Sequence, residues 1–549
     1  MMGINLRYVD EEYDADGIIS KYKLKYPENY NFGYDIVDEI AAAEPDRLAM
    51  VWCNPAGEER KFTFGDISRL SNKTANYLRS IGIKKGDAVL VILKRHYQFW
   101  FVSVALHKLG AVMVPATFML TKRDIEYRVR SASIKAAICT LESGVCEAIE
   151  ASEDIPSLEI KMTVNGPRDG WRFLDGEMES FPDTMERVET HAKEPMLMYF
   201  SSGTSGYPKM VLHDHLYSLA HLFTAKHWQN VDPDGIHFTI ADTGWGKAVW
   251  GKLYGQWIME AAVFVYDFEK FDADDIMNII TKYRITSLCC PPTMFRMFFN
   301  AGVDKHDLSS LKYCCIAGEA LNPDIFYNWE KSTGLKLMEG FGQTETTCTI
   351  CNVRGMKPKP GSMGKPSAQY HVIIADPEGN QCPPGQTGEI LIEYGDPSPP
   401  GIMKGYYRNE EKTAAAIHDG WFHTGDVAWM DEDGYYWFVG RMDDVIKSSG
   451  YKISPFEIES VLVTHPAVLE CAITGVPDPV RGQIVKATVV LRDGYEASDV
   501  LKKELQDFVK RETAPYKYPR ALEFVKELPK TVNGKIMRAA IRKEDEKHE

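Results

Sequence analysis

The stretch Ala88-Val-Leu-Val-Ile-Leu93, continued by Tyr97 to Leu109 and by Ala111-Val-Met-Val-Pro115, decides the fold class. Its first and last segments are continuous apolar runs of strand length, and the segment between them has the length of a helix. Continuous apolar strands are typical of a parallel sheet that is covered on both faces. We therefore predict a βαβ unit at this position.

The same alternation continues on both sides of this unit. Before it, Thr63-Phe-Gly-Asp66 resembles a capping box and opens a helix that ends near Gly82. After it, the pattern predicts a helix over 123–131 and a strand over 134–139, and strands return at 262–266 and 286–290. The sequence thus predicts an α/β fold whose large N-terminal domain consists of two α/β lobes.

The pattern of predicted helices and strands changes twice in the last third of the chain. Short strands at 370–375, 388–393 and 434–439 predict a small β-rich subdomain over about 355–440. The residues after Arg441 alternate between helix and strand patterns and predict a smaller α+β domain. We place the N-terminal domain at residues 1–441 and the C-terminal domain at residues 442–549.

Composition excludes several classes of protein. The 549 residues are 44% hydrophobic and 26% charged, which is an ordinary globular balance. A net charge of −15 argues against general binding of nucleic acid or anionic membranes. No apolar run approaches the roughly 18–20 residues of a membrane span. Because residues 1–16 lack a basic-then-apolar pattern, we predict a cytoplasmic protein without a secretory signal.

The eleven cysteines predict buried thiols and not a disulfide framework. Cys289-Cys290 and Cys314-Cys315 lie inside apolar stretches, as expected for reduced cysteines in a core. Cys348-Thr-Ile-Cys351 has the spacing of metal ligands but no second pair at a suitable distance. His213-Asp-His215 is likewise an isolated pair, for which we predict a structural or solvent-facing position.

One loop concentrates groups that bind anions. The sequence Tyr199-Phe-Ser-Ser-Gly-Thr-Ser-Gly-Tyr-Pro-Lys-Met210 follows a predicted strand. Glycines let successive N–H groups converge on an anion, hydroxyls add donors, and Lys209 adds a compact charge suited to phosphate. The spacing Gly-x-x-Gly-x-x-Lys is not that of a Walker loop. Taken alone, the loop is compatible with either a surface turn or a phosphate site.

Five further stretches carry more functional groups than a core requires. Each of them, taken alone, is compatible with a turn or a solvated charge cluster. They are Ala317-Gly-Glu-Ala-Leu-Asn322, Gly340-Phe-Gly-Gln-Thr-Glu-Thr-Thr347, His423-Thr-Gly-Asp426, Gly440-Arg-Met-Asp-Asp444 and Lys530-Thr-Val-Asn-Gly-Lys535.

In this order, the motifs resemble those of the adenylate-forming superfamily, which includes acyl-CoA synthetases, peptide-synthetase adenylation domains and firefly-type luciferases. The resemblance spans roughly residues 31–538. Finer similarity is to the medium-chain acyl-CoA synthetases, through Asn31-Phe-Gly-Tyr-Asp35, Asp242-Thr-Gly-Trp245 and Thr513-Ala-Pro-Tyr-Lys-Tyr-Pro-Arg520. The resemblance implies a ligase that joins a small carboxylic acid to CoA in fatty acid metabolism, with ATP and Mg²⁺ as further requirements.

The resemblance assigns residues to ATP. Lys535 would bridge the carboxylate and the α-phosphate, Thr344 would bind the α-phosphate, and Glu345 would ligate Mg²⁺. The phosphate loop, the adenine site and the ribose site would follow the family order. The implied ATP contacts are Ser201, Ser202, Gly203, Thr204, Ser205, Gly206, Lys209, Gly318, Glu319, Ala320, Gln343, Asp426 and Arg441.

The second half-reaction is implied to need a domain rotation. In this family the C-terminal domain turns about an acid in the Gly-Arg-x-Asp motif, here Asp443, and replaces Lys535 with a segment around Gly450. A glycine there lets the pantetheine arm pass close to the backbone. The implied CoA contacts are Ser449, Gly450, Tyr451, Arg481, Tyr518 and Arg520.

The acyl pocket is implied to lie near Trp245, Gly340 and Gly342. Acetate-specific relatives carry a tryptophan just before the glutamine of Gly-Gln-Thr-Glu, and this chain has Gly342 there. We therefore expect short-to-medium-chain or branched acids as substrates and poor use of acetate. Trp250 is compatible with a pocket wall or with an ordinary core position, and Lys247 departs from an apolar lining.

Two other functions stay open at this point. The acceptor of the acyl group could differ from CoA, or the chain could be a nucleotide-binding sensor without catalysis. Lys535 and Glu345 argue against a sensor, because a protein that only binds nucleotide needs neither residue. The sequence leaves open whether the protein is a homo-oligomer.

Overall fold

The computed structural model describes residues 3–201, 208–319, 321–449, 451–530 and 536–548. These residues form two compact units. The first unit contains residues 3–201, 209–371 and 393–420, and the second contains residues 372–392 and 421–548. The predicted domain division between residues 441 and 442 stays a prediction.

An eight-stranded sheet forms one layer of the first unit. Its strands are parallel except for β11, which runs antiparallel to both of its neighbours. In sheet order they are β21 (Gly405–Tyr406), β11 (Lys209–Asp214), β10 (Pro195–Ser201), β6 (Val112–Pro115), β5 (Ala88–Ile92), β7 (Ala136–Thr140), β8 (Ile160–Val164) and β9 (Arg172–Phe173).

A nine-stranded sheet forms the second layer. Its central strands are parallel, and antiparallel strands complete both edges. In sheet order they are β18 (Lys365–Pro366), β17 (Ile350–Cys351), β16 (Leu337–Phe341), β15 (Tyr313–Ile316), β14 (Ser287–Cys289), β12 (Ile236–Thr239), β13 (Ala262–Tyr266), β3 (Leu48–Cys53) and β4 (Glu59–Thr63).

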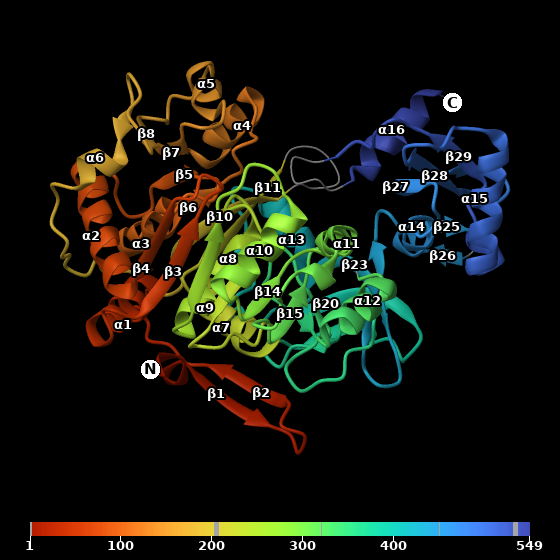
Figure 1. Cartoon of the computed structure of the whole chain (residues 1–549), viewed down its shortest axis with the longest axis horizontal. Helices are drawn as coiled ribbons and strands as arrows, with labels where there is room; N and C mark the ends of the chain where they lie inside the picture. The colour runs from red at the N-terminus through yellow and green to blue at the C-terminus, as the bar shows by residue number, and fades with distance from the viewer. Residues whose placement is uncertain (1–2, 202–207, 320, 450, 531–535, 549) are drawn as a thin grey trace. The chain divides into compact units, whose positions relative to one another are not determined.

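Alternation along the strands explains why each sheet is buried on both faces. Val89 and Val91 of β5 and Val263 and Val265 of β13 belong to one shared core. The residues between them face two outer cores instead. Side chains alternate across a strand with a period of two, so a continuous apolar run serves both faces. The helices therefore form a central layer and two outer layers (Figure 1).

The helices divide between these layers. The shared core includes residues of α1 (Glu39–Ala43), α2 (Phe64–Ser80), α3 (Gln98–Leu109), α7 (Leu216–Phe223), α8 (Gly246–Lys252) and α9 (Tyr254–Ile258), and of two π-helices, η2 (Gly33–Asp38) and η3 (Thr224–Trp228). The outer cores include α4 (Lys122–Ala132), α5 (Val145–Glu150), α10 (Ala273–Tyr283), α11 (Pro292–Ala301) and α12 (Pro323–Thr333). The remaining short elements are η1 (Ile4–Arg7), α6 (Leu174–Met178), η4 (Val303–Lys305), α13 (Glu410–Ala416) and β22 (Ile417–His418).

The local predictions are confirmed in this unit. Strands β5 and β6 are parallel neighbours joined by α3, as the βαβ prediction requires. Thr63 accepts a hydrogen bond from the Asp66 N–H, and the Asp66 carboxylate accepts one from the Thr63 N–H, which is the predicted capping box. The chemistry at the start of α2 is thus readable from the sequence alone.

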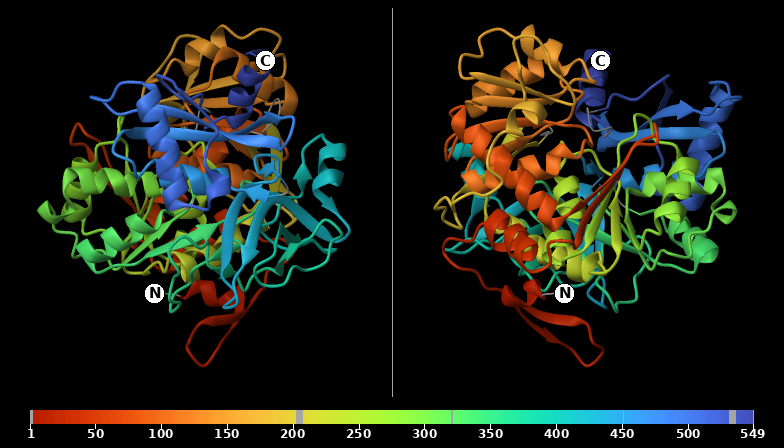
Figure 2. Two further views of the ribbon diagram at one scale, coloured as in Figure 1. Left: turned by 90° about the vertical axis from the view of Figure 1, so that its right-hand side faces the viewer. Right: turned by 60° about the vertical axis from the view of Figure 1, so that its left-hand side comes forward.

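The sequence does not reveal the structure of the N-terminal segment. Strands β1 (Val9–Tyr13) and β2 (Ile19–Leu24) form an antiparallel hairpin that projects from the first unit (Figure 2). Its inward acid, Glu11, pairs with Lys226 at 2.6 Å and with His227 at 2.8 Å. These strands are as polar as a typical loop, and one of their inward-facing residues is an acid. The sequence therefore lacks the apolar alternation that would predict a hairpin.

The second unit contains two antiparallel-rich sheets. The first includes β19 (Val372–Ala375), β20 (Thr387–Glu393), β23 (Trp421–Met430) and β24 (Tyr436–Arg441), and it matches the predicted β-rich subdomain. The second includes β26 (Tyr451–Ile453), β25 (Ile446–Ser448), β28 (Gly482–Leu491), β27 (Val468–Asp478) and β29 (Ala521–Phe524). Its helical elements are α14 (Pro455–Leu462), α15 (Asp499–Glu512), η5 (Pro515–Lys517) and α16 (Arg538–His548), so the predicted α+β character is confirmed.

Two further predictions concern the whole chain. All eleven cysteines lie in the described part of the chain, and each is buried and outside any disulfide, as the apolar surroundings predict. Among the described residues, no helix combines the length and the apolar character that a membrane span requires.

Candidate active site

Tyr406 brings together two residues that the sequence motifs single out. Strand β21 pairs with β11 so that Tyr406 lies opposite Val211, close to the start of β11 at Lys209. The Tyr406 hydroxyl donates to the Glu345 carboxylate at 3.0 Å. The Lys209 ammonium lies 4.8 Å from the centre of the Tyr406 ring, a cation–π distance. One aromatic side chain therefore holds a cation and a carboxylate in one place.

The backbone around Thr344 and Glu345 is held by hydrogen bonds from other elements. His213 of β11 bonds the Thr344 carbonyl through Nε2 at 2.8 Å, and the Met403 N–H donates to the Glu345 carbonyl at 2.8 Å. The Gln343 N–H donates to the Thr346 hydroxyl at 2.9 Å. Because His213 and Met403 hold the backbone carbonyls of Thr344 and Glu345, the side chains of the loop project from a fixed backbone.

His213 takes part in this support in its neutral form. Burial lowers the pKa of His213 to about 4, so the ring is uncharged near neutral pH and Nε2 carries the donated proton. The ring also stacks on Tyr217, with 3.8 Å between ring centres. His213 and His215 are both fully buried, which agrees with the structural alternative and excludes the solvent-facing one.

The predicted adenine segment lies beside a buried acid. Gly318 has φ of +100°, a conformation that favours glycine, and Glu319 accepts a hydrogen bond from the Thr293 hydroxyl at 2.6 Å. Glu339 of β16 is buried, and its Oε1 accepts from the Leu321 N–H at 3.4 Å. Its Oε2 has no hydrogen-bond partner among the described residues. Burial raises the pKa of Glu339 to about 8, so the carboxyl is mainly protonated at neutral pH.

Glu339 is a functional candidate that the motif analysis missed. The available signal is a lone acid inside the apolar run Leu337-Met-Glu-Gly-Phe341, just before the Gly-Gln-Thr-Glu motif. Acids are rarely buried without a charged partner, and a buried acid with a strongly shifted pKa is a candidate for a functional site. With Oε1 accepting from the Leu321 N–H, the orphaned Oε2 is left to carry the proton and suits a hydrogen bond to an acceptor on a polar ligand.

Two tryptophans press against the glycines of the predicted acyl pocket. A Cβ atom on Gly342 would lie 2.5 Å from the Trp250 ring and 2.2 Å from the Thr347 carbonyl oxygen. A Cβ atom on Gly340 would lie 2.4 Å from the Trp228 ring. The Trp250 indole N–H donates to the Tyr217 hydroxyl at 3.0 Å, which fixes the ring. The indole of Trp250 therefore occupies part of the space that Gly342 leaves.

The other residues of the predicted pocket are half-buried. Trp245 is the N-cap of α8, and its indole N–H has no hydrogen-bond partner among the described residues. Lys247 donates to the Ala317 carbonyl at 2.8 Å, next to the predicted adenine segment. Lys247 thus connects α8 to the strand end just before Gly318. Its partner in this contact is a neutral backbone carbonyl.

In the second unit, Asp426 and Arg441 are neighbours across two strands. They are direct partners in the β23–β24 register, and the Arg441 guanidinium lies 3.3 Å from the Asp426 carboxylate. Arg441 also donates to the Thr424 carbonyl at 3.0 Å. Asp426 is 4% exposed, whereas the Arg441 side chain is 39% exposed. The pair presents a fixed carboxylate and a guanidinium, as a ribose site needs.

The two acids that follow Arg441 differ in how firmly they are held. Asp443 lies 3.8 Å from the Arg441 guanidinium and is 41% exposed. Asp444 is bound by Arg542 at 2.7 Å and by Arg538 at 3.6 Å. Asp443, which the family resemblance assigns to the hinge, is the less firmly held of the two, and its role stays a prediction.

The predicted CoA contacts form three small groups in the second unit. Arg481 donates to the Ser449 hydroxyl at 3.4 Å, and the Ser449 N–H donates to the Arg481 carbonyl at 2.9 Å. Tyr451 stacks on Tyr516 with 4.2 Å between ring centres. Arg520 donates to the Tyr518 hydroxyl at 2.7 Å.

Several predicted residues fall outside the described part of the chain. Ser201 is described and lies opposite Lys209 at the end of β10. The predicted residues outside the described ranges are Ser202, Gly203, Thr204, Ser205, Gly206, Ala320, Gly450 and Lys535. Their assigned roles stay predictions.

Comparison with known proteins identifies the family of this chain. Residues 37–407 match the model of the AMP-binding enzyme family, and residues 457–535 match the AMP-binding enzyme C-terminal domain. The chain belongs to this adenylate-forming family.

Relatives of known name agree with this assignment. The chain is 41% identical to human "Acyl-coenzyme A synthetase ACSM3, mitochondrial" over 95% of this chain and 91% of that protein. It is 40% identical to rat "Acyl-coenzyme A synthetase ACSM4, mitochondrial" over 96% and 92%. The predictions of an acid–thiol ligase and of an AMP-forming acyl-CoA synthetase that uses ATP, CoA and Mg²⁺ are confirmed.

Solved structures share the fold. The anthranilate CoA ligase AuaEII in complex with anthranoyl-AMP is 30% identical, with a TM-score of 0.86 over 95% of this chain and 98% of that chain. A benzoate CoA ligase from Burkholderia xenovorans LB400 is 26% identical, with a TM-score of 0.80 over 93% and 100%. The predicted fold class is therefore confirmed by similarity as well as by topology.

One prediction is wrong. The sequence analysis predicts a cytoplasmic location, and the curated relatives are named as mitochondrial proteins, which contradicts it. The composition of the first residues is too weak a signal to decide a cellular location.

The raised pKa of Glu339 predicts a pH-dependent loss of stability. The unfolded carboxyl titrates near 4.5 and the folded one near 8, so between these values the folded state binds more protons. Stability therefore falls as pH rises through this window. Glu339→Gln keeps the neutral form at every pH. We expect the difference in melting temperature, variant minus parent, to increase steadily from about pH 5 to about pH 8.

The matched control is Glu153→Gln, because the Glu153 side chain is 86% exposed. Its melting curve should follow that of the parent at every pH. A Glu339→Gln variant whose stability difference stays constant with pH would contradict a protonated buried carboxyl.

Proposed function

We propose that this acyl-CoA ligase activates short-to-medium-chain or branched carboxylic acids, with the described residues in the roles that follow. The observation that supports the site assignment is the contact of Tyr406 with both Lys209 and Glu345. A phosphate-binding cation and a metal-binding carboxylate are needed on the same triphosphate, and Tyr406 holds these two groups together.

In the first half-reaction, an oxygen of the substrate carboxylate attacks the α-phosphorus of ATP. The new P–O bond forms as the bond to the bridging oxygen breaks, and pyrophosphate leaves with that electron pair. Lys209 would hold the leaving phosphates, and Thr344 would donate its hydroxyl to the α-phosphate. Glu345 would hold Mg²⁺, which neutralises negative charge on the phosphate oxygens.

The nucleoside would be held by residues of the adenine and ribose motifs. Glu339 and the segment at Gly318 would read the polar edge of adenine, and the protonated Glu339 carboxyl offers a hydrogen-bonding group there. Asp426 would accept hydrogen bonds from the ribose hydroxyls, and Arg441 would fix that carboxylate. The orphaned Glu339 Oε2 supports this fit, because a polar ligand group would satisfy it.

In the second half-reaction, the CoA thiolate attacks the acyl carbon and AMP leaves. Lys535 would serve only the first step, because a bridging cation at the carboxylate obstructs the approach of the thiol. Rotation about Asp443 would exchange Lys535 for the segment at Ser449 and Tyr451. Arg481 and Arg520 supply positive charge for the CoA phosphates, and the exposed, weakly held Asp443 is compatible with a hinge.

The acyl pocket is proposed to be short because Trp250 closes it. Gly342 leaves room for an acyl chain, but the Trp250 ring comes within 2.5 Å of where a Cβ atom on Gly342 would lie. The hydrogen bond to Tyr217 holds the ring there. A pocket wall made of one fixed indole favours short or branched chains over long straight ones.

Tyr406→Phe tests the support of Glu345. The substitution keeps the ring beside Lys209 and removes the hydroxyl that donates to Glu345. Outer hydrogen bonds to metal-binding carboxylates are typically worth 10- to 100-fold in metal affinity. We expect the Mg²⁺ concentration for half-maximal adenylation to rise by about tenfold. Tyr407→Phe, at the neighbouring position, should leave it within about twofold, and an unchanged Mg²⁺ requirement in Tyr406→Phe would refute the role.

Lys535→Ala tests the division of labour between the half-reactions. We expect ATP–pyrophosphate exchange to fall by about 10²- to 10³-fold, the scale of a lost transition-state donor. Thioester formation from a supplied acyl-adenylate should remain close to that of the parent. Equal loss of both half-reactions would refute alternation.

The matched control for this variant is Lys530→Ala. The Lys530 ammonium pairs with Glu470 at 2.7 Å in the second unit and has no role in the proposed chemistry. Both half-reactions should proceed normally in this variant. A carboxylate-dependent exchange in the parent also separates an adenylating enzyme from a nucleotide sensor, and thioester formation after CoA is added separates CoA from other acceptors.

Trp250→Ala tests the length of the acyl pocket. Removing the indole should let longer chains bury additional methylenes, each worth about 0.8 kcal/mol. We expect the ratio of kcat/KM for octanoate over butyrate to rise at least about tenfold. Trp171→Ala is a matched control, because Trp171 is also mostly buried and its indole N–H makes one hydrogen bond, to Glu150.

Trp171→Ala should lose stability comparably without changing chain-length preference. If Trp250→Ala keeps the preference of the parent, the wall of the pocket is elsewhere. Gly342→Trp is a less clean test of the same pocket, because even a Cβ atom there would meet the Thr347 carbonyl oxygen at 2.2 Å.

A further inference from the structure

A charged loop in the first unit contacts the turn that carries Trp245. The turn Asp242-Thr-Gly-Trp245 follows β12 and leads into α8. The Lys94 carbonyl accepts hydrogen bonds from both the N–H and the hydroxyl of Thr243. The Arg95 guanidinium lies 3.6 Å from the Asp242 carboxylate, with both side chains less than 10% exposed. Consecutive residues of one loop therefore bind consecutive residues of the turn.

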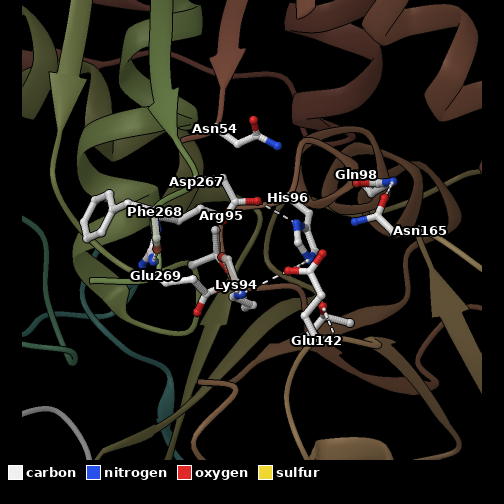
Figure 3. Close-up of polar contacts among 12 residues, drawn as sticks. Asn54, Lys94, Arg95, His96, Gln98, Glu142, Asn165, Asp267, Phe268 and Glu269 are labelled. Carbon is white, nitrogen blue, oxygen red and sulfur yellow. Dashed lines mark hydrogen bonds and ion pairs between the residues drawn. The ribbon is translucent and has the colours of Figure 1, made fainter. Parts of the chain in front are cut away.

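The same loop is anchored on its other side. Lys94, Arg95 and His96 contact Glu269, Phe268 and Asp267 in reverse order, one residue to one residue (Figure 3). Lys94 also reaches Glu142 at 3.1 Å, and Arg95 lies 4.2 Å from the centre of the Phe268 ring. This paired segment connects the end of β5 in one sheet to the end of β13 in the other.

The turn also contacts the backbone on its other side. A Cβ atom on Gly244 would lie 2.2 Å from the Thr117 nitrogen, so the turn packs directly on the backbone after β6. At the other end of α8, the buried Lys252 ammonium donates to the Ala241 carbonyl. The Asp242 carboxylate also accepts from the Gly244 N–H at 2.9 Å. The segment from Ala241 to Lys252 is therefore fixed at both ends.

The position of His96 separates two roles within the loop. His96 bonds Asp267 at 2.6 Å and Thr140 at 2.7 Å, so it connects the sheets without a hydrogen bond or ion pair to the turn. Arg95 makes the connection to Phe268 and the ion pair to Asp242 as well. A buried ion pair is a weak source of net stability, because desolvation offsets the attraction. The pair of Arg95 and Asp242 is therefore better explained by orientation of the turn.

We propose that Lys94 and Arg95 are positioning residues for the acyl site: they hold the Asp242–Trp245 turn, and through it the Trp245 indole, in the orientation that binds the acyl chain. The inference rests on the proposed place of Trp245 in the acyl pocket. Arg95 acts through its guanidinium on Asp242, and Lys94 acts through its backbone carbonyl on Thr243. Neither residue contacts the substrate in this role.

Arg95→Gln is the main test, measured by the KM values for the carboxylic acid and for ATP in pyrophosphate exchange. Small misplacements of a positioning group cost up to about 10²-fold. We expect the acid KM to rise by roughly ten- to a hundredfold while the ATP KM stays within about twofold. Arg95→Lys keeps the charge and should recover part of the loss. Thr243→Val removes one hydrogen bond to the Lys94 carbonyl and should raise the acid KM in the same direction.

His96→Gln is the matched control within the loop. It weakens the connection between the sheets, so we expect a lower melting temperature with the acid KM within about twofold of the parent. If His96→Gln and Arg95→Gln raise the acid KM equally, the loop has only a structural role and the inference is overturned.

A double-mutant cycle with Trp245→Ala decides whether Arg95 acts through Trp245. Trp245→Ala alone should raise the acid KM, and Arg95→Gln should then add less than about twofold in that background. If the two effects multiply in full, Trp245 belongs to the pocket but Arg95 does not act through it, and the inference fails. If Trp245→Ala leaves the acid KM unchanged, the proposed place of Trp245 fails, and the inference fails with it.

Discussion

The contact of Lys209 and Glu345 with one aromatic ring is the interaction on which the site depends. Tyr406 offers its face to the ammonium and its hydroxyl to the carboxylate. It reaches both because β21, a strand of two residues, pairs with β11 at the edge of the eight-stranded sheet. A residue almost 200 positions away from Lys209 in the sequence thereby sets the geometry of the phosphate loop's last residue. The antiparallel arrangement at this sheet edge thus brings Tyr406 to the two residues that the proposal assigns to phosphate and metal.

Buried carboxyl groups recur beside the motif segments. Asp242, Glu339 and Asp426 are each less than 10% exposed, and each lies in or beside a segment that the motifs assign to substrate. Their surroundings differ: Asp242 and Asp426 lie beside arginines, whereas burial raises the pKa of Glu339 to about 8. Burial also raises the pKa of Asp242, despite the nearby Arg95 guanidinium. The local environment decides which chemistry each acid offers.

Features that depend on neighbouring residues can be predicted from the sequence, whereas contacts between segments far apart in the chain cannot. The βαβ unit at 88–115 and the capping box at Thr63 are readable because their signals lie within a few residues. The motif residues Thr344, Glu345, Asp426 and Arg441 follow from family resemblance, since their order along the chain is the signal. Tyr406, Glu339 and Arg95 carry no comparable pattern. Each acquires its role from strand pairing or burial that joins segments separated by many residues.

The acyl pocket shows why a single position is a poor guide to the size of a cavity. Gly342 suggests an open pocket, since an indole is absent at that position. In the structure, the Trp250 indole packs against the backbone at Gly342, and its N–H donates to Tyr217. An indole from a different helix therefore fills part of the volume that the glycine leaves open. Gly340 and Trp228 repeat this packing two residues earlier in the sequence. In the proposed pocket, the space beside each glycine therefore depends on the tryptophan packed against it, because protein interiors are close-packed.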